Sequence, residues 1–283
     1  MTSVGVDDRT VAAAEGLVVV QQTDSVGSLF GLALPARECK DAGMQKYRQY
    51  CPVSRALEIL ADRWTLLIVR ELILGSHRFN EIERGLPGIS RSLLSSRLRC
   101  LEEAGIIDRL PGLQPKVTVY HLSAAGQDLK TVVETLGAWG VRWAFGEPRP
   151  EELDAGLLVW KIHQRINRDL LPDRRTVVEF DFTGSGGRRV WLLLEPREVS
   201  VCVTPPGFDS DLVVRTDLAL FYRVWLGAID YDSAVRCRSV VVEGLPALVK
   251  QLPRWLMWSP MARFVQDRDR VPAALPEGER RAI

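Results

Sequence analysis

The sequence predicts an α+β protein with two domains, in which a mainly helical N-terminal half precedes a half that mixes strands and helices. Three observations lead to this prediction. The chain has 283 residues, which is more than most single domains contain. Two prolines between charged residues at 147–152 are typical of a linker. Apolar residues recur at helical spacing before this segment, and β-branched runs alternate with helical patterns after it.

The composition is that of a soluble globular protein, with 46% hydrophobic and 26% charged residues and a net charge of +1. No run approaches the roughly 18 apolar residues that a membrane span needs, so we expect no membrane partner. The five cysteines lack CxxC spacing, which argues against a zinc site or a disulfide framework and favours a reducing cytoplasm. The three histidines are well separated, and we expect neither a metal nor a cofactor.

The sequence contains no catalytic constellation, and we expect the protein not to be an enzyme. Gly184-Ser185-Gly186-Gly187 resembles a phosphate-binding loop in composition. A phosphate loop must lead into a helix, whereas this segment lies between two strand-like runs, so it is interpreted as a hairpin turn.

A helix rich in serine and arginine is predicted at 91–101. Leu94, Leu98 and Leu101 fall on one stripe of this helix. Ser90 suits the N-cap, because its hydroxyl can accept a bond from an unpaired N–H of the first turn. The other face is polar and basic, since positions 84–101 hold four arginines and no acid. Such a face can approach a DNA groove, although an ordinary amphipathic surface helix is the alternative.

The neighbouring segments favour DNA binding. A short apolar helix at 78–86 and the turn Pro87-Gly88 precede the serine-rich helix, which makes a helix-turn-helix arrangement. Two β-rich runs, at 106–109 and 116–122, predict a hairpin wing after it. We therefore expect a winged helix-turn-helix domain at 44–146 that binds double-stranded DNA. The predicted DNA-binding residues are Arg78, Ser90, Arg91, Ser92, Ser95, Ser96, Arg97, Arg99, Arg109 and Lys116.

Residues 51–72 predict two scaffold helices with a break near Ala61-Asp62. Their pattern, C-P-V-S-R-A-L to R-W-T-L-L-I-V-R-E-L, resembles the HxlR family of bacterial winged-helix regulators. The likeness covers about 45–146 and continues through R-F-N-E-I, G-I-S-R-S-L-L-S-S-R-L-R-C-L-E-E-A-G-I-I and V-Y-H-L-S-A-A-G. One departure is Ala61-Asp62-Arg63-Trp64, where the family more often has a glycine before the basic residue and the tryptophan. A slightly different helix junction is expected there.

The resemblance implies a transcriptional regulator that binds a near-palindromic operator as a homodimer, with repression as the commoner outcome. The two recognition helices would then lie about one DNA turn apart. A helix at 125–145 would form the dimer interface, and packing within its own chain is the alternative. Its apolar face comprises Leu129, Val132, Val133, Leu136, Trp139 and Trp143.

The second domain is predicted at 153–258. A helix at 153–170 precedes strands at 176–182, 189–194, 199–204, 212–215 and 239–243, with helices at 217–227 and 245–258. The block D-L-V-V-R-T-D-L-A-L-F-Y-R-V-W-L-G, followed by V-V-V-E-G-L-P-A-L-V-K-Q-L, resembles the end of sterol-carrier-protein-like domains. That resemblance implies an apolar tunnel, and a small apolar ligand that shifts the spacing of the DNA-reading helices. Candidate pocket residues are Trp160, Trp191, Phe221, Trp225 and Trp255; packed core is the alternative.

Cys51 has two interpretations. In some HxlR proteins a cysteine at this place senses oxidants, and a helix start with Arg48 and Arg55 nearby would favour its thiolate. The other interpretation is a small residue that seats the first helix. A redox sensor through Cys51 and a ligand sensor or carrier are thus the alternatives to a regulator. Residues 1–43 are expected to be a flexible extension and 259–283 a disordered tail.

Overall fold

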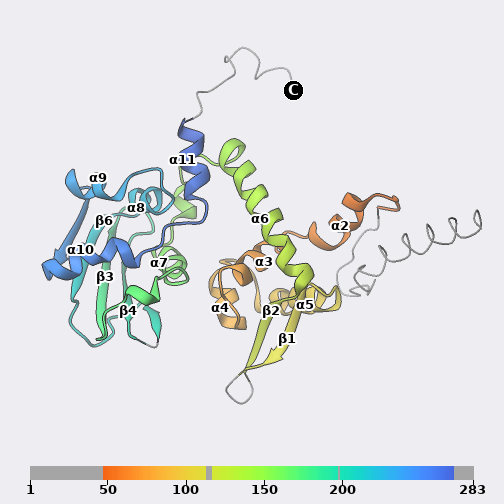
Figure 1. The fold of residues 1–283 in the computed structure, drawn as a ribbon, viewed down its shortest axis with the longest axis horizontal. Helices are drawn as coiled ribbons and strands as arrows, with labels where there is room; N and C mark the ends of the chain where they lie inside the picture. Colours follow the sequence, from red (N-terminus) through yellow and green to blue (C-terminus); the bar gives the residue numbers. More distant parts are fainter. Residues whose placement is uncertain (1–46, 113–116, 197, 271–283) are drawn as a thin grey trace, which may run out of the picture.

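The computed structural model describes residues 47–112, 117–196 and 198–270, and it places them in two domains (Figure 1). The N-terminal domain is a winged helix-turn-helix, as the sequence predicts. The expected extension at 1–43 lies outside the described residues. The elements of this domain are α2 (Pro52–Leu60), α3 (Thr65–Ile73), α4 (Phe79–Arg84), α5 (Arg91–Glu103), β1 (Ile107–Pro111), β2 (Thr118–Leu122) and α6 (Ala124–Trp143).

The core of this domain forms beneath α5. Leu94, Leu98 and Leu101 are buried on the stripe that the helical spacing predicts. The hydroxyl of Ser90 accepts a hydrogen bond from the N–H of Leu93 at 3.3 Å, which confirms the predicted N-cap. The chain leaves the helix through Gly105, which has a φ of +71° that favours glycine.

The junction between α2 and α3 is built around Asp62. Its carboxylate accepts the backbone N–H of Trp64 at 3.2 Å and forms an ion pair with Arg97 of α5 at 2.5 Å. A glycine could make neither contact. The departure from the family pattern therefore joins the scaffold helices to the serine-rich helix by a specific ion pair.

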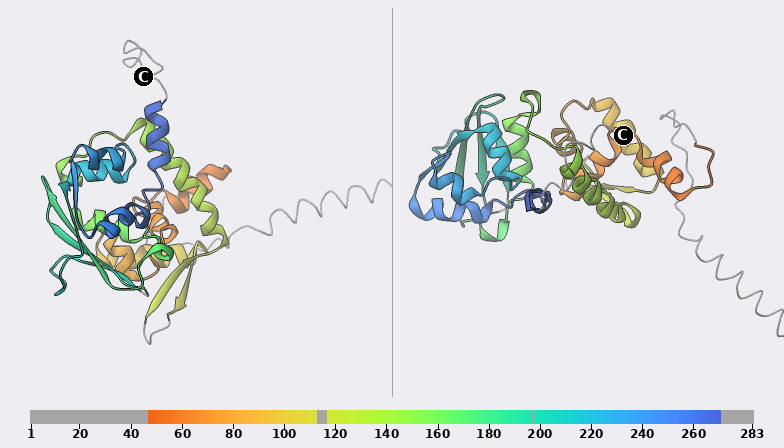
Figure 2. Two further views of the ribbon diagram at one scale, coloured as in Figure 1. Left: turned by 60° about the vertical axis from the view of Figure 1, so that its left-hand side comes forward. Right: turned by 90° about the horizontal axis from the view of Figure 1, so that it is seen from above.

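The C-terminal domain is a five-stranded sheet with its helices packed on one face (Figure 2). The strand order is β5-β4-β3-β6-β7, with β3 parallel to β6 and the other pairs antiparallel. The strands are β3 (Thr176–Thr183), β4 (Arg189–Leu194), β5 (Val199–Cys202), β6 (Leu212–Asp217) and β7 (Val240–Gly244). The helices are η2 (Pro150–Glu152), α7 (Ala155–His163), η3 (Arg168–Leu170), α8 (Leu218–Trp225), α9 (Tyr231–Arg236) and α10 (Pro246–Trp255).

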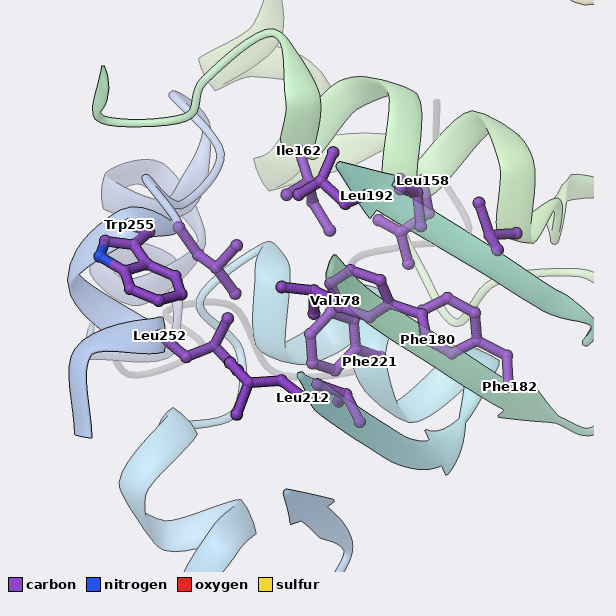
Figure 3. Packing of buried hydrophobic residues seen from close by; sticks show 14 of the residues in the cluster. Leu158, Ile162, Val178, Phe180, Phe182, Leu192, Leu212, Phe221, Leu252 and Trp255 are labelled. Atoms are coloured by element: carbon purple, nitrogen blue, oxygen red, sulfur yellow. The ribbon is translucent and has the colours of Figure 1, made fainter. Parts of the chain in front are cut away.

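Alternation along β3 separates the two faces of this sheet. Val178, Phe180 and Phe182 point into the core, where both phenyl rings pack against Phe221 of α8 with ring centroids 5.6–5.8 Å apart (Figure 3). Asp181, on the other face, lies 3.5 Å from an arginine on each neighbouring strand. Burial of each large side chain contributes about 1.5–3 kcal/mol, so the helix-covered face holds the domain together.

Two sequence-based boundaries are wrong. The helix expected at 153–170 ends at His163, and the separate turn η3 follows it. The tail expected from residue 259 instead contains α11 (Ala262–Arg270), in which Val265 is 1% exposed. Most residues of this segment are charged, so its apolar pattern is short. It consists of Met261, directly before the helix, and Val265 four residues later, which lie on one side of the helix. Residues 271–283 lie outside the described residues.

The domains meet at a buried carboxylate. Glu71 of α3 has no solvent exposure, and its Oε1 accepts from Lys161 Nζ at 2.5 Å and from its neighbour Arg70 at 2.8 Å. Gln164 Nε2 donates to Oε2 at 3.1 Å and to the hydroxyl of Ser76 at 2.7 Å. Burial lowers the pKa of Lys161 to about 8, and the facing carboxylate opposes that shift. Both domains therefore contribute to one buried charged cluster.

Helix α4 packs against the same cluster and extends the contact to β5. A Cβ at Gly85 would overlap the Glu71 carboxylate, so only glycine permits this approach. Arg84 places its guanidinium 4.7 Å from the ring centroid of Trp160 and donates to the carbonyl of Val201 at 3.3 Å. The side chain thereby satisfies one carbonyl of the edge strand β5, and His163 Nε2 lies 2.8 Å from another, that of Val199.

We expect Glu71→Ala to lower the free energy of unfolding by about 3–5 kcal/mol, because it leaves a buried lysine without its counter-charge. The matched control is Glu243→Ala, which removes an exposed ion pair with Arg215 and is expected to cost about 0–1 kcal/mol. Urea denaturation followed by circular dichroism measures both values. Equal, small losses in the two variants would contradict a structural role for the cluster.

Candidate nucleic-acid interface

Helix α5 presents the polar face that the sequence predicts. Ser92, Ser95 and Arg99 are exposed on it, and Ser96 is half-buried at its margin. Ser90 is exposed at the N-cap, with its hydroxyl 3.2 Å from that of Ser92. The leucine stripe occupies the opposite face, so the polar face is turned away from the core. This arrangement exposes short hydroxyl side chains and an arginine on the outer face of the helix.

Arg91 links the two helices of the helix-turn-helix. Its guanidinium forms an ion pair with Glu83 of α4, donates a hydrogen bond to Asn80 Oδ1 at 3.1 Å and lies 4.8 Å from the ring centroid of Phe79. The side chain is exposed, so this ion pair contributes at most about 1 kcal/mol. The ion pair can therefore break at small cost, and while it is formed it links α5 to α4.

Arg97 does not belong to the exposed face. Its side chain is 17% exposed and forms the ion pair with Asp62 described above. Residue 97 lies one turn from Leu94 and Leu101, near the inner side of the helix, and its predicted phosphate contact stays a prediction. The side chain thus joins α5 to the α2–α3 junction.

The wing is an antiparallel hairpin whose pairing runs from Ile107 with Leu122 to Pro111 with Thr118. Arg109 is exposed on β1. Arg78 is exposed at the start of α4. Lys116 lies outside the described residues, so its predicted contact stays a prediction.

Two stacked histidines join the wing to the segment before α4. This contact is not predicted from the sequence. His77 and His121 stack with ring centroids 4.4 Å apart. His77 Nδ1 lies 3.0 Å from the carbonyl oxygen of Tyr120, whose own N–H donates to the carbonyl of His77 at 2.8 Å. The two segments are more than forty residues apart in the chain, and no local pattern in either signals the contact.

Helix α6 has three distinct faces. Leu129 and Val133 pack against the core of the winged domain. Gly137 and Val141 lie on a second face, towards α11, where Val141 is buried. The third face is exposed and apolar at the helical spacing of 4, 3 and 4 residues; it consists of Val132, Leu136, Trp139 and Trp143. The broad apolar face expected from sequence is thus divided between packing within the chain and an exposed stripe.

Cys51 is the N-cap residue of α2 and is half-buried. Backbone N–H groups of Ser54 and Val53 stabilise its thiolate, and they lower the pKa of the thiol below its usual range. The sequence correctly placed this cysteine at a helix start. Arg55 is expected from the sequence to stabilise the thiolate as well. Its guanidinium instead forms an ion pair with Glu58 at 3.4 Å.

The five pocket candidates do not lie in one place. Phe221 and Trp255 are fully buried in the core, and the indole N–H of Trp255 donates to the carbonyl of Leu170 at 2.8 Å. Trp191 is on the opposite sheet face, where its indole donates to Glu179 at 3.3 Å. Trp160 lies at the domain boundary beneath Arg84, and Trp225 packs at the edge of the core. Phe221 and Trp255 therefore fit the packed-core alternative.

In the part of the chain that the structure describes, no helix is long and apolar enough to cross a membrane. The same residues contain no group of three or more histidine, cysteine or acidic side chains that could hold a metal ion.

Comparison with known proteins gives matches to the N-terminal domain. The model of the HxlR-like helix-turn-helix family matches residues 59–147. An HTH-type transcriptional regulator of Mycobacterium tuberculosis is 47% identical over 100 residues, which is 35% of this chain and 61% of the relative. The chain thus spans less than two thirds of that protein. The transcriptional regulator YodB from B. subtilis, in its reduced form, is similar in structure at 33% identity and a TM-score of 0.31, covering 34% of this chain and 96% of that one.

A second relative is covered almost completely. The HTH-type transcriptional regulator YvaP of Bacillus subtilis is 37% identical over 98 residues, which make up 34% of this chain and 90% of YvaP. The matched region contains the scaffold helices, the serine-rich helix and the wing described above. By its N-terminal domain, this chain belongs to the HxlR-like helix-turn-helix family.

Proposed function

We propose that the protein is a sequence-specific, DNA-binding transcriptional regulator whose C-terminal domain modulates binding. The observation that carries this proposal is the exposed Ser/Arg face of α5, held between α4 and a two-stranded wing. In such an arrangement the second helix enters the major groove. Arginine and serine side chains there can read base edges, and the wing can bind backbone phosphate.

The protein acts as a homodimer on a near-palindromic operator. The exposed stripe of α6 supports this part of the proposal, because four large apolar side chains on one helix face are unusual at a solvent-exposed surface. A second copy of the same stripe would cover it by two-fold symmetry. The symmetric dimer would present two α5 helices to successive turns of the groove, and it would repress a promoter that it covers.

Binding to DNA tests the function directly. Purified protein is titrated with the DNA upstream of its own gene and with scrambled DNA over a range of salt concentrations. We expect tighter binding to the upstream DNA and a steep fall in affinity with salt, since bound phosphates release counterions. Equal and weak binding to both sequences would overturn the proposal.

The variant Arg91→Ala is expected to cost about 1–3 kcal/mol of binding to the preferred DNA, because it removes a base-reading arginine. The matched control, Arg254→Ala, changes an exposed arginine of α10 in the C-terminal domain and is expected to leave affinity within about 0.5 kcal/mol. Fluorescence anisotropy measures both. An unchanged affinity for Arg91→Ala would remove this residue from the interface.

Dimer formation is tested at the stripe of α6. We expect Trp139→Glu to weaken the dimer by at least about 2 kcal/mol, roughly thirtyfold in the dissociation constant, because it places a charge in the apolar contact. Thr131→Glu adds the same charge on another exposed face of α6 and should leave the dimer intact. Sedimentation velocity over a concentration series distinguishes them, and two identical profiles would contradict the assignment of the stripe.

A second candidate function, thiol-based sensing through Cys51, is favoured by the lowered pKa of that thiol. A lowered pKa leaves more thiolate at neutral pH, so alkylation of Cys51 should decline less than that of a free thiol as the pH falls below about 8.5. Iodoacetamide labelling with peptide mass spectrometry measures the rate at each cysteine. Peroxide should then alter DNA binding in the parent protein and not in Cys51→Ser; the same response in both would exclude this role.

A further inference from the structure

The C-terminal half of α6 extends beyond the core of its own domain (Figure 1). Leu129 and Val133, in the first half of the helix, pack against that core. Gly137 and Val141, in the second half, instead face α11 of the C-terminal region, and Val141 is buried there. The direction of the second half is therefore determined by its contact with α11.

Helix α11 is fixed to the C-terminal domain where it begins. The N–H of Ser259 donates to the carbonyl of Trp225 at 3.0 Å. Gly227, at the end of α8, has a φ of +79°, and a Cβ at this position would lie 2.9 Å from that of Ala262. This close approach leaves α11 little freedom to shift relative to α8.

The same segment contacts α6 along the second half of that helix. A Cβ at Gly137 would lie 2.5 Å from the sulfur of Met261, the residue directly before α11, so the start of α11 is in close contact with α6. Arg263 forms an ion pair with Glu134 at 3.0 Å. Arg268 donates to the carbonyls of Val141 and Phe145 at 3.3 and 3.0 Å, and so binds the carbonyl end of α6, where positive charge is favourable.

The contact with α11 and the exposed stripe lie on opposite sides of α6. At 100° per residue, Gly137 and Val141 point about 130–180° away from the centre of the stripe around Val132 and Trp143. A displacement of α11 would therefore turn or tilt the stripe. The buried cluster around Glu71 joins the same domains at a second place, through α3 and α7, and can serve as the fixed point of such a movement.

We propose that α11 is a brace that sets the direction of α6, and thereby the separation of the two recognition helices in the dimer. This inference rests on the proposed function of a DNA-binding dimer. It supplies a physical route by which the C-terminal domain acts on DNA binding. A change in that domain moves α11, α11 moves α6, and the spacing of the half-sites that both α5 helices can reach changes.

The test uses the full chain and an operator that it selects from a pool of random duplexes. The distance between the two half-sites is then changed one base pair at a time, and affinity is measured for each spacing and for a single half-site. Deletion of 261–283 removes α11, and deletion of 271–283 is the matched control. Because the larger deletion can also affect folding, a second variant combines Arg263→Ala with Arg268→Ala in the complete chain.

We expect the control deletion to keep the spacing preference of the parent. Loss of α11, or of its two arginines, should weaken binding at the preferred spacing about tenfold, which is about 1.4 kcal/mol, and flatten the preference. Affinity for a single half-site should change by less than about twofold, because α5 itself is intact. An unchanged spacing profile in the double variant would overturn the brace. A parent chain that selects no duplex would instead refute the proposed function on which it rests.

Discussion

Glu71 lies where α3, α4 and α7 meet, and the relative placement of the two domains depends on how its carboxylate is satisfied. A carboxylate without solvent exposure is costly unless cations and hydrogen-bond donors surround it. Here one lysine and one glutamine come from the C-terminal domain, whereas Arg70 comes from its own helix. Separation of the domains would remove Lys161 and Gln164 from the carboxylate, so the cluster favours one docking geometry.

The same constraint reaches the DNA-facing surface through α4. Gly85 allows the end of α4 to approach the carboxylate, and Arg84 extends from there to the sheet edge. At the other side of α4, Glu83 and Asn80 hold Arg91 at the beginning of α5. Helix α4 is therefore in contact with both the domain junction and the proposed recognition helix, which gives it a positioning role.

Helix α6 combines three functions in one element because its faces have different partners. One face completes the winged domain, the second receives α11, and the third is an exposed apolar stripe suited to a second copy. Packed helices shift as rigid units more readily than they deform. A signal that reaches α11 would therefore be transmitted along α6 rather than absorbed within it.

Local patterns in the sequence determined the elements of the N-terminal domain. The leucine spacing and Ser90 identify α5, the Pro-Gly turn separates it from α4, and the β-rich runs give the wing, because these signals depend on neighbouring residues. The strands of the C-terminal domain follow from their β-branched and apolar runs, which are also local signals. The likeness of that domain to sterol-carrier-protein-like domains stays a prediction.

Only the tertiary structure decided which polar side chains face solvent and which face each other. Arg97 and Arg91 look alike in sequence, yet one is held inside by Asp62 and the other is exposed beside Glu83. The burial of Glu71, the stacking of His77 on His121 and the docking of α11 on α6 also depend on segments that are far apart in the chain. Their energies come from desolvation and close packing between distant segments, which no local pattern encodes.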